Sequence, residues 1–157
     1  MSGIVPRLEK FLEEHGVEYD VIPHKNDYRA KVTARDTGTP QSEFAKTVFV
    51  LIDGEDALVV VPADRDVALS KLRDALGATE VCLAREDEFH EFCPDCEVGA
   101  APPFGNLYGL PVYVSTSLAA DDMITFNAGT HSSAVRMAYS DFERLVGPRV
   151  LALCKHE

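Results

Sequence analysis

Residues 44–61 read Phe-Ala-Lys-Thr-Val-Phe-Val-Leu-Ile-Asp-Gly-Glu-Asp-Ala-Leu-Val-Val-Val and carry the strongest secondary-structure signal in the chain. Two apolar runs rich in β-branched residues flank Asp53-Gly54, a dipeptide typical of a hairpin turn. Successive side chains of a strand point to opposite faces, and both faces of the first run are largely apolar. The stretch therefore predicts a hairpin whose first strand is central in a sheet, with Lys46 at the start of a face directed to the interior.

Turn signals and hydrophobic periodicity divide the rest of the chain into short elements. Strands are expected at residues 18–23, 80–84, 111–115, 123–126, 134–139 and 150–153, helices at 2–14, 28–36, 64–76, 85–92 and 141–146, and a turn at 117–121. Many strands and few helices, without strict alternation, predict an α+β domain with a curved, barrel-like mixed sheet flanked by helices. The length of 157 residues favours a single compact domain, residues 1–157.

The charge balance limits the partners that the chain can gather. Twenty-six acidic and fifteen basic residues give a formal net charge of −11, which repels polyanions at long range. A nucleic acid must therefore be held by a local basic site or presented by another protein. No run approaches the length of a membrane span, and the N-terminus lacks the apolar core of a signal peptide. We expect a cytoplasmic protein with no membrane partner.

The four cysteines give only a weak chemical signal. Cys93 and Cys96 have the spacing of redox and metal motifs, but no second pair at zinc-ribbon spacing and no thioredoxin-like frame accompany them. His90 and Glu91 lie nearby and leave a redox or zinc protein as a minor alternative. Because nothing suggests export, reduced thiols are the default expectation. We expect neither a metal nor a cofactor.

Lys46 is the first candidate for chemistry. An unpaired ammonium is costly to bury, so a lysine on an apolar face must reach water or find an anion. One interpretation is a structural lysine whose aliphatic stem covers apolar surface while its charge reaches solvent. The other is a lysine that points into a cleft, where it suits phosphate or carbonyl oxygens.

Two loops rich in small residues are the other candidates. Residues 97–109 contain two prolines and three glycines, which give a loop of defined shape whose backbone N–H groups could bind a ligand oxygen. Residues 127–133 (Asn-Ala-Gly-Thr-His-Ser-Ser) offer an imidazole, an amide and three hydroxyls. A tight structural turn and a structural histidine are the alternatives. No dedicated nucleophile stands out, which favours a site that positions substrate and water with backbone groups.

Three pieces in order resemble one known family: Phe44-Ala45-Lys46-Thr47, then Gly99 followed by Pro103-Phe104-Gly105, then Asn127-Ala128-Gly129-Thr130-His131 leading to Ser140-Asp141-Phe142. The family is that of YbaK and the prolyl-tRNA-synthetase-associated domains, which are editing deacylases acting on mischarged tRNA. The resemblance covers nearly the whole chain. Each piece alone is weak, but their order and spacing together are specific.

The resemblance implies hydrolysis of the ester that joins an amino acid to the terminal adenosine of tRNA. Water would attack the ester carbonyl, with main-chain amides and the ribose hydroxyl helping to position it. The implied partners are a mischarged tRNA acceptor end, bound weakly and transiently, and an aminoacyl-tRNA synthetase. The implied catalytic residues are Lys46, Gly105 and His131, and the implied substrate-binding residues are Thr47, Gly99, Pro102, Pro103, Phe104, Asn106, Gly129 and Thr130.

The chain departs from the cysteinyl-tRNA deacylases of that family at two points. Pro102 replaces a serine before the loop proline, which removes a hydroxyl and a backbone N–H. Thr130 and His131 replace basic residues, so His131 can be a base, a contact for the substrate amine or a scaffold. The stiffer wall at Pro102 predicts discrimination by shape, and the edited amino acid stays open. These departures also motivate the alternative of a non-catalytic binding module that recognises a tRNA end, a nucleotide or a synthetase.

Overall fold

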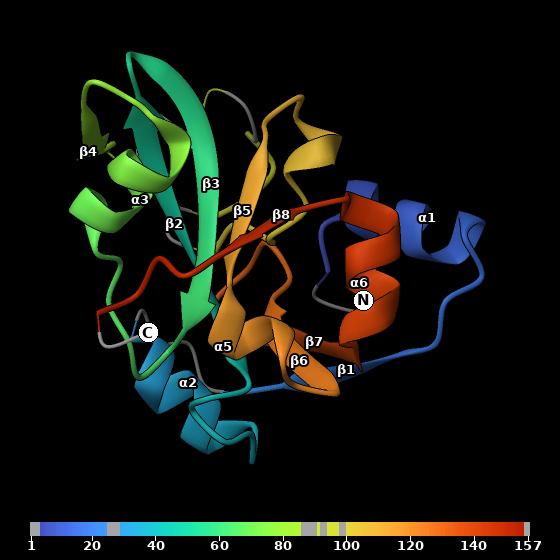
Figure 1. The fold of residues 1–157 in the computed structure, drawn as a ribbon. Helices are drawn as coiled ribbons and strands as arrows, with labels where there is room; N and C mark the ends of the chain where they lie inside the picture. The colour runs from blue at the N-terminus through green and yellow to red at the C-terminus, as the bar shows by residue number, and fades with distance from the viewer. Residues whose placement is uncertain (1–3, 25–28, 86–90, 92–93, 98–99, 156–157) are drawn as a thin grey trace.

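The computed structural model describes residues 4–24, 29–85, 91, 94–97 and 100–155 (Figure 1). Its helices are α1 (Pro6–Glu14), α2 (Ala30–Asp36), α3 (Leu69–Leu76), α5 (Thr116–Ala119), α6 (Tyr139–Val146) and the 3-10 helix η1 (Gly105–Leu107). Its strands are β1 (Tyr19–Pro23), β2 (Phe44–Ile52), β3 (Glu55–Pro62), β4 (Val81–Leu83), β5 (Val112–Ser115), β6 (Met123–Asn127), β7 (Ser133–Ala138) and β8 (Arg149–Leu151). Within these residues, no helix is long and apolar enough to cross a membrane.

The strands form one mixed sheet, which confirms the predicted fold class. Its order is β1-β7-β6-β2-β3-β5-β8, with β4 paired to β2 off this path. The pairs β2–β6, β3–β5 and β5–β8 are parallel, and the other pairs are antiparallel. Because the path of described strands ends at β1 and β8 without joining them, the sheet is open and is not a closed barrel.

The predicted hairpin is the centre of this sheet. Strands β2 and β3 pair from Ala45↔Pro62 to Ile52↔Glu55. Asp53 and Gly54 form the turn with φ of 50° and 82°, the left-handed values that a two-residue hairpin turn of this kind requires. β2 has neighbours on both edges and apolar clusters on both faces, as its sequence predicts.

Helices cover both faces of the sheet. The larger apolar cluster lies between the sheet and helices α1 and α6, which Figure 1 shows side by side at one end of the molecule. A second cluster joins the hairpin to α3 on the other face. Helix α2 packs over a small third cluster that contains Phe44, Ala63 and Ala134. Helix α2 therefore covers the first residues of β2 and β7 and the end of β3.

Three local predictions need correction. Helix α1 starts at Pro6 with Val5 as its N-cap, and the predicted cap Ser2 lies outside the described residues. Helix α3 starts at Leu69 instead of Asp64, because Val67 forms a β-bridge with Cys154 and holds the preceding chain extended. Residues 116–119 form helix α5, whose Leu118 N–H donates to the Ser115 hydroxyl at 3.2 Å. The helix expected at 85–92 falls largely outside the described residues.

Candidate active site

One edge of strand β2 is shared by two short partners. β6 pairs with Phe44 and Ala45 at one end of this edge, and β4 pairs with residues 50–52 at the other. Between these partners, residues 46–48 have no strand beside them on that edge in the described part of the chain. A central strand with an interrupted edge can present main-chain groups to a ligand. Lys46 and Thr47, two of the predicted site residues, lie in this interruption.

Lys46 lies beside the start of the second candidate loop. Ala45 of β2 is in register with Phe126 of the parallel strand β6, so the next positions, Lys46 and Asn127, lie at the same level. The Lys46 Nζ donates to the Arg65 carbonyl oxygen at 2.9 Å and lies 3.6 Å from the Asp66 Oδ1. The Lys46 side chain is 29% exposed. Its ammonium therefore reaches the surface, and its stem packs along the sheet.

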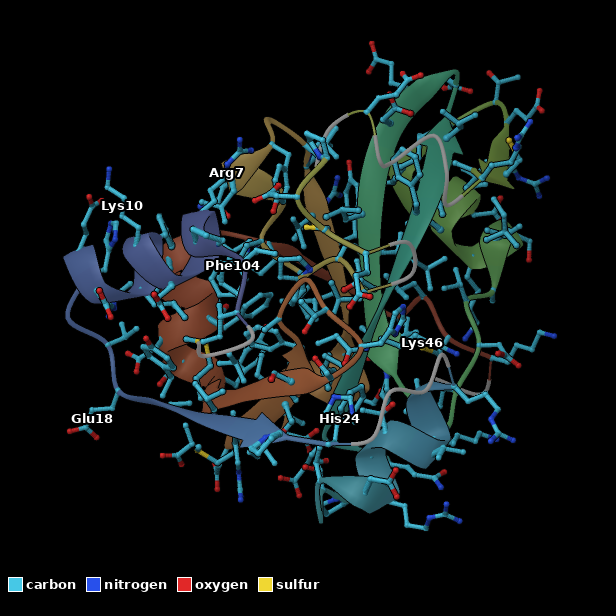
Figure 2. All side chains as sticks on the ribbon, turned by 180° about the vertical axis from the view of Figure 1, so that it is seen from behind. Arg7, Lys10, Glu18, His24, Lys46 and Phe104 are labelled. Carbon is cyan, nitrogen blue, oxygen red and sulfur yellow. The ribbon has the colours of Figure 1, made fainter. Side chains whose placement is uncertain are left out.

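Two cavities border the Lys46 region. One, of about 400 Å³, is lined by Arg29, Ala30, Lys31, Val32, Lys46 and Ala63. The other, of about 490 Å³, is lined by Asp64, Arg65, Asp66 and Lys155. Figure 2 shows Lys46 at the end of the hairpin above α2, with His24 near the same end of the molecule. The cavity beside α2 carries three cationic side chains, a composition that suits an anionic ligand in an otherwise acidic protein.

The loop at 127–133 is fixed by backbone contacts. Gly129 adopts φ of 94°, and a Cβ there would collide with the side chain of Val5. His131 is 1% exposed, and its backbone N–H donates to the Glu97 Oε1 at 2.8 Å. The Thr130 hydroxyl lies 3.3 Å from that of Ser132. The buried position of the imidazole points to a scaffold role for His131 in this structure.

The two candidate loops form one unit. The Glu97 N–H donates to the Gly129 carbonyl at 2.7 Å, and the Gly129 N–H donates to the Ala100 carbonyl at 2.9 Å. Together with the bond from His131 to the Glu97 carboxylate, these contacts make residues 97 and 100 a continuation of the loop at 127–133. The predicted site residue Gly99 lies outside the described residues.

Phe104 is placed differently from the expectation that it lines a substrate pocket. Its side chain is 0% exposed, and its ring lies 5.4 Å from that of Phe126 and 5.5 Å from that of Phe142, measured between centroids. Pro102 and Pro103 are also buried. Figure 2 shows Phe104 toward α1 and α6, well separated from Lys46. In this structure these three side chains anchor the loop in the core.

Gly105 and Asn106 follow Phe104 away from Lys46. A Cβ on Gly105 would lie 2.6 Å from the Leu110 carbonyl oxygen, so the chain packs too tightly there for a side chain. Asn106 is exposed on the 3-10 helix η1. The register thus places Lys46 level with Asn127, the first residue of the loop at 127–133, whereas residues 102–105 are buried against the aromatic core.

Several residues of the site were missed by the sequence reasoning. Arg65 and Asp66 contact Lys46, but their pattern was assigned to the first turn of a helix. Arg29 and Lys31 line the cavity beside Lys46, and only their place in a polar stretch could have indicated them. Glu97 ties the two loops together through a backbone N–H, a contact that leaves no pattern in the sequence.

Acidic residues gather near the Lys46 end of the sheet. Burial, with further contributions from Glu43, Asp122 and Asp64, raises the pKa of Asp121 to about 6. The Asp121 Oδ2 is buried and has no hydrogen-bond partner among the described residues. These carboxylates limit the positive potential to the immediate surroundings of Lys46 and α2.

The cysteine expectations are partly corrected. Cys96 is buried and disulfide-bonded, whereas reduced thiols were expected, and Cys93 lies outside the described residues. Within the described part of the chain, no group of three or more His, Cys, Asp or Glu side chains could hold a metal ion.

Comparison with known proteins connects this geometry to a family. A sequence model described as "Aminoacyl-tRNA editing domain" matches residues 24–145, which include Lys46 and both candidate loops. The chain belongs to this family. The resemblance carried by the three sequence motifs is thereby confirmed.

Relatives of this editing domain cover most of the chain. The multifunctional Ser/Thr-tRNA deacylase ProXp-y of Escherichia coli (strain K12) is 26% identical over 156 residues, covering 92% of this chain and 89% of that protein. The prolyl-tRNA editing protein ProX of Acetoanaerobium sticklandii is 25% identical over 142 residues, covering 86% and 85%. A crystal structure described as that of a candidate trans-editing enzyme for prolyl tRNA synthetase has a TM-score of 0.83 at 22% identity, covering 96% of each chain. This last likeness shows a shared fold.

Proposed function

We propose that this chain is a trans-editing aminoacyl-tRNA deacylase that hydrolyses the ester of a mischarged aminoacyl-tRNA. Membership of the editing-domain family supports the reaction class, and the deacylases among its relatives align over nearly their full length. The observation that carries the proposal is the position of Lys46. Its side chain is partly exposed beside the turn that follows β3, and it lines a cavity together with Arg29 and Lys31.

The reaction needs a positioned water and stabilisation of negative charge. Water attacks the ester carbonyl carbon, and the bond from that carbon to the ribose oxygen breaks. One proton of the water goes to the ribose oxygen, and the other is released to solvent as the amino acid leaves as a carboxylate. Negative charge develops on the carbonyl oxygen in the transition state. The Thr47 main-chain N–H is the donor that we assign to this oxygen, because Lys46 and Val48 pair with β3 and Thr47 alternates with them toward the interrupted edge of β2.

Lys46 holds an anionic oxygen of the tRNA 3′ end. The ammonium has three N–H groups, and the Arg65 carbonyl accepts from one of them. A substrate phosphate can accept from another and displace Asp66, because an exposed ion pair of this kind contributes about 1 kcal/mol or less. Arg29 and Lys31 extend the cationic surface along α2.

His131 acts as a positioning residue in this proposal. Its ring is buried and its backbone N–H is held by Glu97, so it fixes the loop from which neighbouring main-chain groups reach the substrate. Thr130, which is half-buried next to it, is the residue of the loop that contacts the substrate. Gly129 keeps the loop close to α1, where a side chain would collide with Val5.

The substrate encounter is weak and local. The net charge of −11 opposes tight binding of a whole tRNA, since phosphate contacts dominate such affinity. Contact through the acceptor end alone fits the small cationic surface around Lys46. Association with an aminoacyl-tRNA synthetase, which would present the mischarged end, is part of the proposal.

The test is a deacylation assay with a panel of tRNAs that carry labelled non-cognate amino acids. We expect wild-type protein to release label from at least one member and Lys46→Ala to lower kcat/KM by about 10- to 100-fold, the effect of losing a charge-assisted hydrogen bond. Lys71→Ala is the matched control, because the Lys71 Nζ also donates to a backbone carbonyl, that of Cys154, but lies on α3. It should retain wild-type activity.

Two results would contradict the proposal. Wild-type protein that hydrolyses no member of the panel is not a deacylase of this class. Stable binding of a tRNA or a synthetase without turnover, unaffected by Lys46→Ala, would identify a binding module of the same fold. Equal losses in the Lys46 and Lys71 variants would assign the effect to folding instead of substrate contact.

A further inference from the structure

The turn at residues 64–66 holds Lys46 from one side. The Arg65 N–H donates to the Pro62 carbonyl at 3.1 Å, which closes the turn directly after strand β3. The Lys155 N–H donates to the Asp66 carbonyl at 3.4 Å, and the β-bridge between Val67 and Cys154 follows immediately. Backbone bonds on both sides therefore fix the place from which the Asp66 carboxylate faces Lys46.

The two contacts of the Lys46 ammonium differ in kind. The Arg65 carbonyl lies at hydrogen-bonding distance, 2.9 Å, and belongs to the fixed backbone of the turn. The Asp66 Oδ1 lies at 3.6 Å, outside hydrogen-bonding distance, on a side chain that is 79% exposed. The hydrogen bond to Arg65 orients the ammonium. The Asp66 carboxylate offsets its positive charge without forming a hydrogen bond to it.

We propose that Asp66 is a specificity-determining residue that sets the affinity of Lys46 for the anionic end of the substrate. The inference rests on the proposed function. In the free protein the Asp66 carboxylate balances the charge of Lys46. When a phosphate binds Lys46, the carboxylate becomes a like charge close to that phosphate and weakens binding. An anion with a single weak contact is thereby rejected, and a tRNA end that also reaches Arg29 and Lys31 is retained.

This arrangement predicts an effect on binding and not on chemistry. Asp66→Asn keeps the size of the side chain and removes its charge, so KM should fall by about two- to fivefold at low salt, the range expected for one exposed charge pair. The kcat should stay within about twofold of wild type, because Arg65 still orients the ammonium. The difference in KM should vanish near 1 M salt, where the screening length is about 3 Å. Asp66→Glu should restore the wild-type KM.

Asp64→Asn is the matched control. It makes the same change of charge on the same turn, and Asp64 is exposed with no ion pair to Lys46 among the described contacts. The inference is overturned if Asp66→Asn leaves KM unchanged or raises it, if Asp64→Asn lowers KM equally, or if the effect persists at 1 M salt. In the last two cases the cause would be the general field of the protein or a change of structure.

A binding measurement separates this inference from the proposed function. Fluorescence anisotropy with an RNA hairpin that ends in the tRNA acceptor sequence and carries no amino acid reports binding without hydrolysis. If the protein hydrolyses no mischarged tRNA but binds the hairpin through Lys46, and Asp66→Asn tightens that binding at low salt, the deacylase proposal fails and the role of Asp66 stands. If wild-type protein and the Asp66 variant bind the hairpin equally or not at all, the role of Asp66 is wrong.

Discussion

Two regions of the molecule contrast in how they are built. The loop pair, residues 97 and 100–110 with 127–133, is tied by backbone hydrogen bonds, and most of its large side chains are buried. The charged edge, made of Glu43, Lys46, Asp64, Asp66 and Asp121, keeps its polar groups at or near the surface. The loop pair has the more unusual composition, with its prolines and glycines, yet its conspicuous side chains serve the core. Unusual composition marks a demanding backbone shape, and the groups able to meet a charged ligand lie on the charged edge.

The physical reason for the contrast is the cost of burial. Apolar rings such as Phe104 stabilise the fold in proportion to the surface they bury, so a loop that must keep one shape is anchored by them. Charged groups are costly to bury without partners, so most of those on the charged edge stay where water or a ligand can reach them, and the partly buried Asp121 carries that cost as a raised pKa. A substitution in the loop pair should therefore change stability first, whereas one at the charged edge should change binding or pH dependence.

The largest effect is expected for Phe104→Ala. Removal of a fully buried ring that contacts Phe11, Phe126 and Phe142 should lower the free energy of unfolding by about 3–5 kcal/mol. For a chain of this length that loss lowers Tm by about 10 °C. Urea denaturation and a thermal melt followed by circular dichroism measure it.

The comparison variant for Phe104→Ala is Lys46→Ala. The Lys46 side chain is partly exposed and contacts a surface turn, so the Tm of the Lys46→Ala variant should stay within about 3 °C of wild type. A Phe104 variant as stable as wild type would mean that the ring faces a cavity after all, and the contrast between the two regions would fail at its centre.

A smaller effect is expected where the two loops are tied together. Glu97→Gln keeps an acceptor oxygen but removes the charge that strengthens the bond from the His131 N–H. Because Glu97 is exposed, we expect a loss of about 1 kcal/mol or less in the free energy of unfolding. Hydrogen exchange of the His131 amide should accelerate, and kcat should fall severalfold while KM changes little.

Glu55→Gln supplies the control for the tie between the loops. Glu55 is an exposed residue of the central hairpin, far along the chain from either loop. It loses the same charge and should leave both the His131 exchange rate and kcat unchanged. Equal exchange rates in the Glu97 variant and wild type would show that the other two backbone bonds suffice to hold the loops.

The sequence predicts those parts of the fold that depend on local patterns. The hairpin at 44–61, its Asp-Gly turn and the central place of β2 follow from alternation and β-branching over a continuous stretch. Lys46 could be identified because a single charge interrupts an apolar face. These features need no knowledge of which distant residues come together.

The rest depends on contacts between distant segments. The local pattern assigned Asp66 to a helix. The β-bridge between Val67 and Cys154 prevents that helix from starting there, and it could not be seen in the sequence because its two residues lie far apart in the chain. The pocket role of Phe104 was implied by the family resemblance, and only packing against α1 and α6 reveals the burial of its ring. The bonds between the two loops involve main-chain atoms, which every residue carries.

The smallest effect, and one of opposite sign, is expected for Asp121→Asn. The pKa of Asp121 is raised from 3.8 to about 6, first by burial and then by Glu43, Asp122 and Asp64. The folded protein therefore binds this proton more tightly than the unfolded chain does. Below pH 3.8 Asp121 is protonated in both states and has no effect on stability. As pH rises from 3.8 to about 6 the free energy of unfolding falls, and above that the ionised carboxylate imposes a constant penalty on the fold.

Asp121→Asn removes this penalty and should stabilise the protein at pH 7.5 by about 1 kcal/mol or less, since solvent screens a side chain that is only partly buried. The gain should shrink toward zero at pH 4, where wild-type Asp121 is protonated in the fold. Urea denaturation of both proteins at the two pH values measures the difference. Asp20→Asn, an exposed change of the same charge on β1, should show no such dependence. A gain that is equal at both pH values would mean that the introduced amide forms a new contact. Ionisation of Asp121 would then not destabilise the fold.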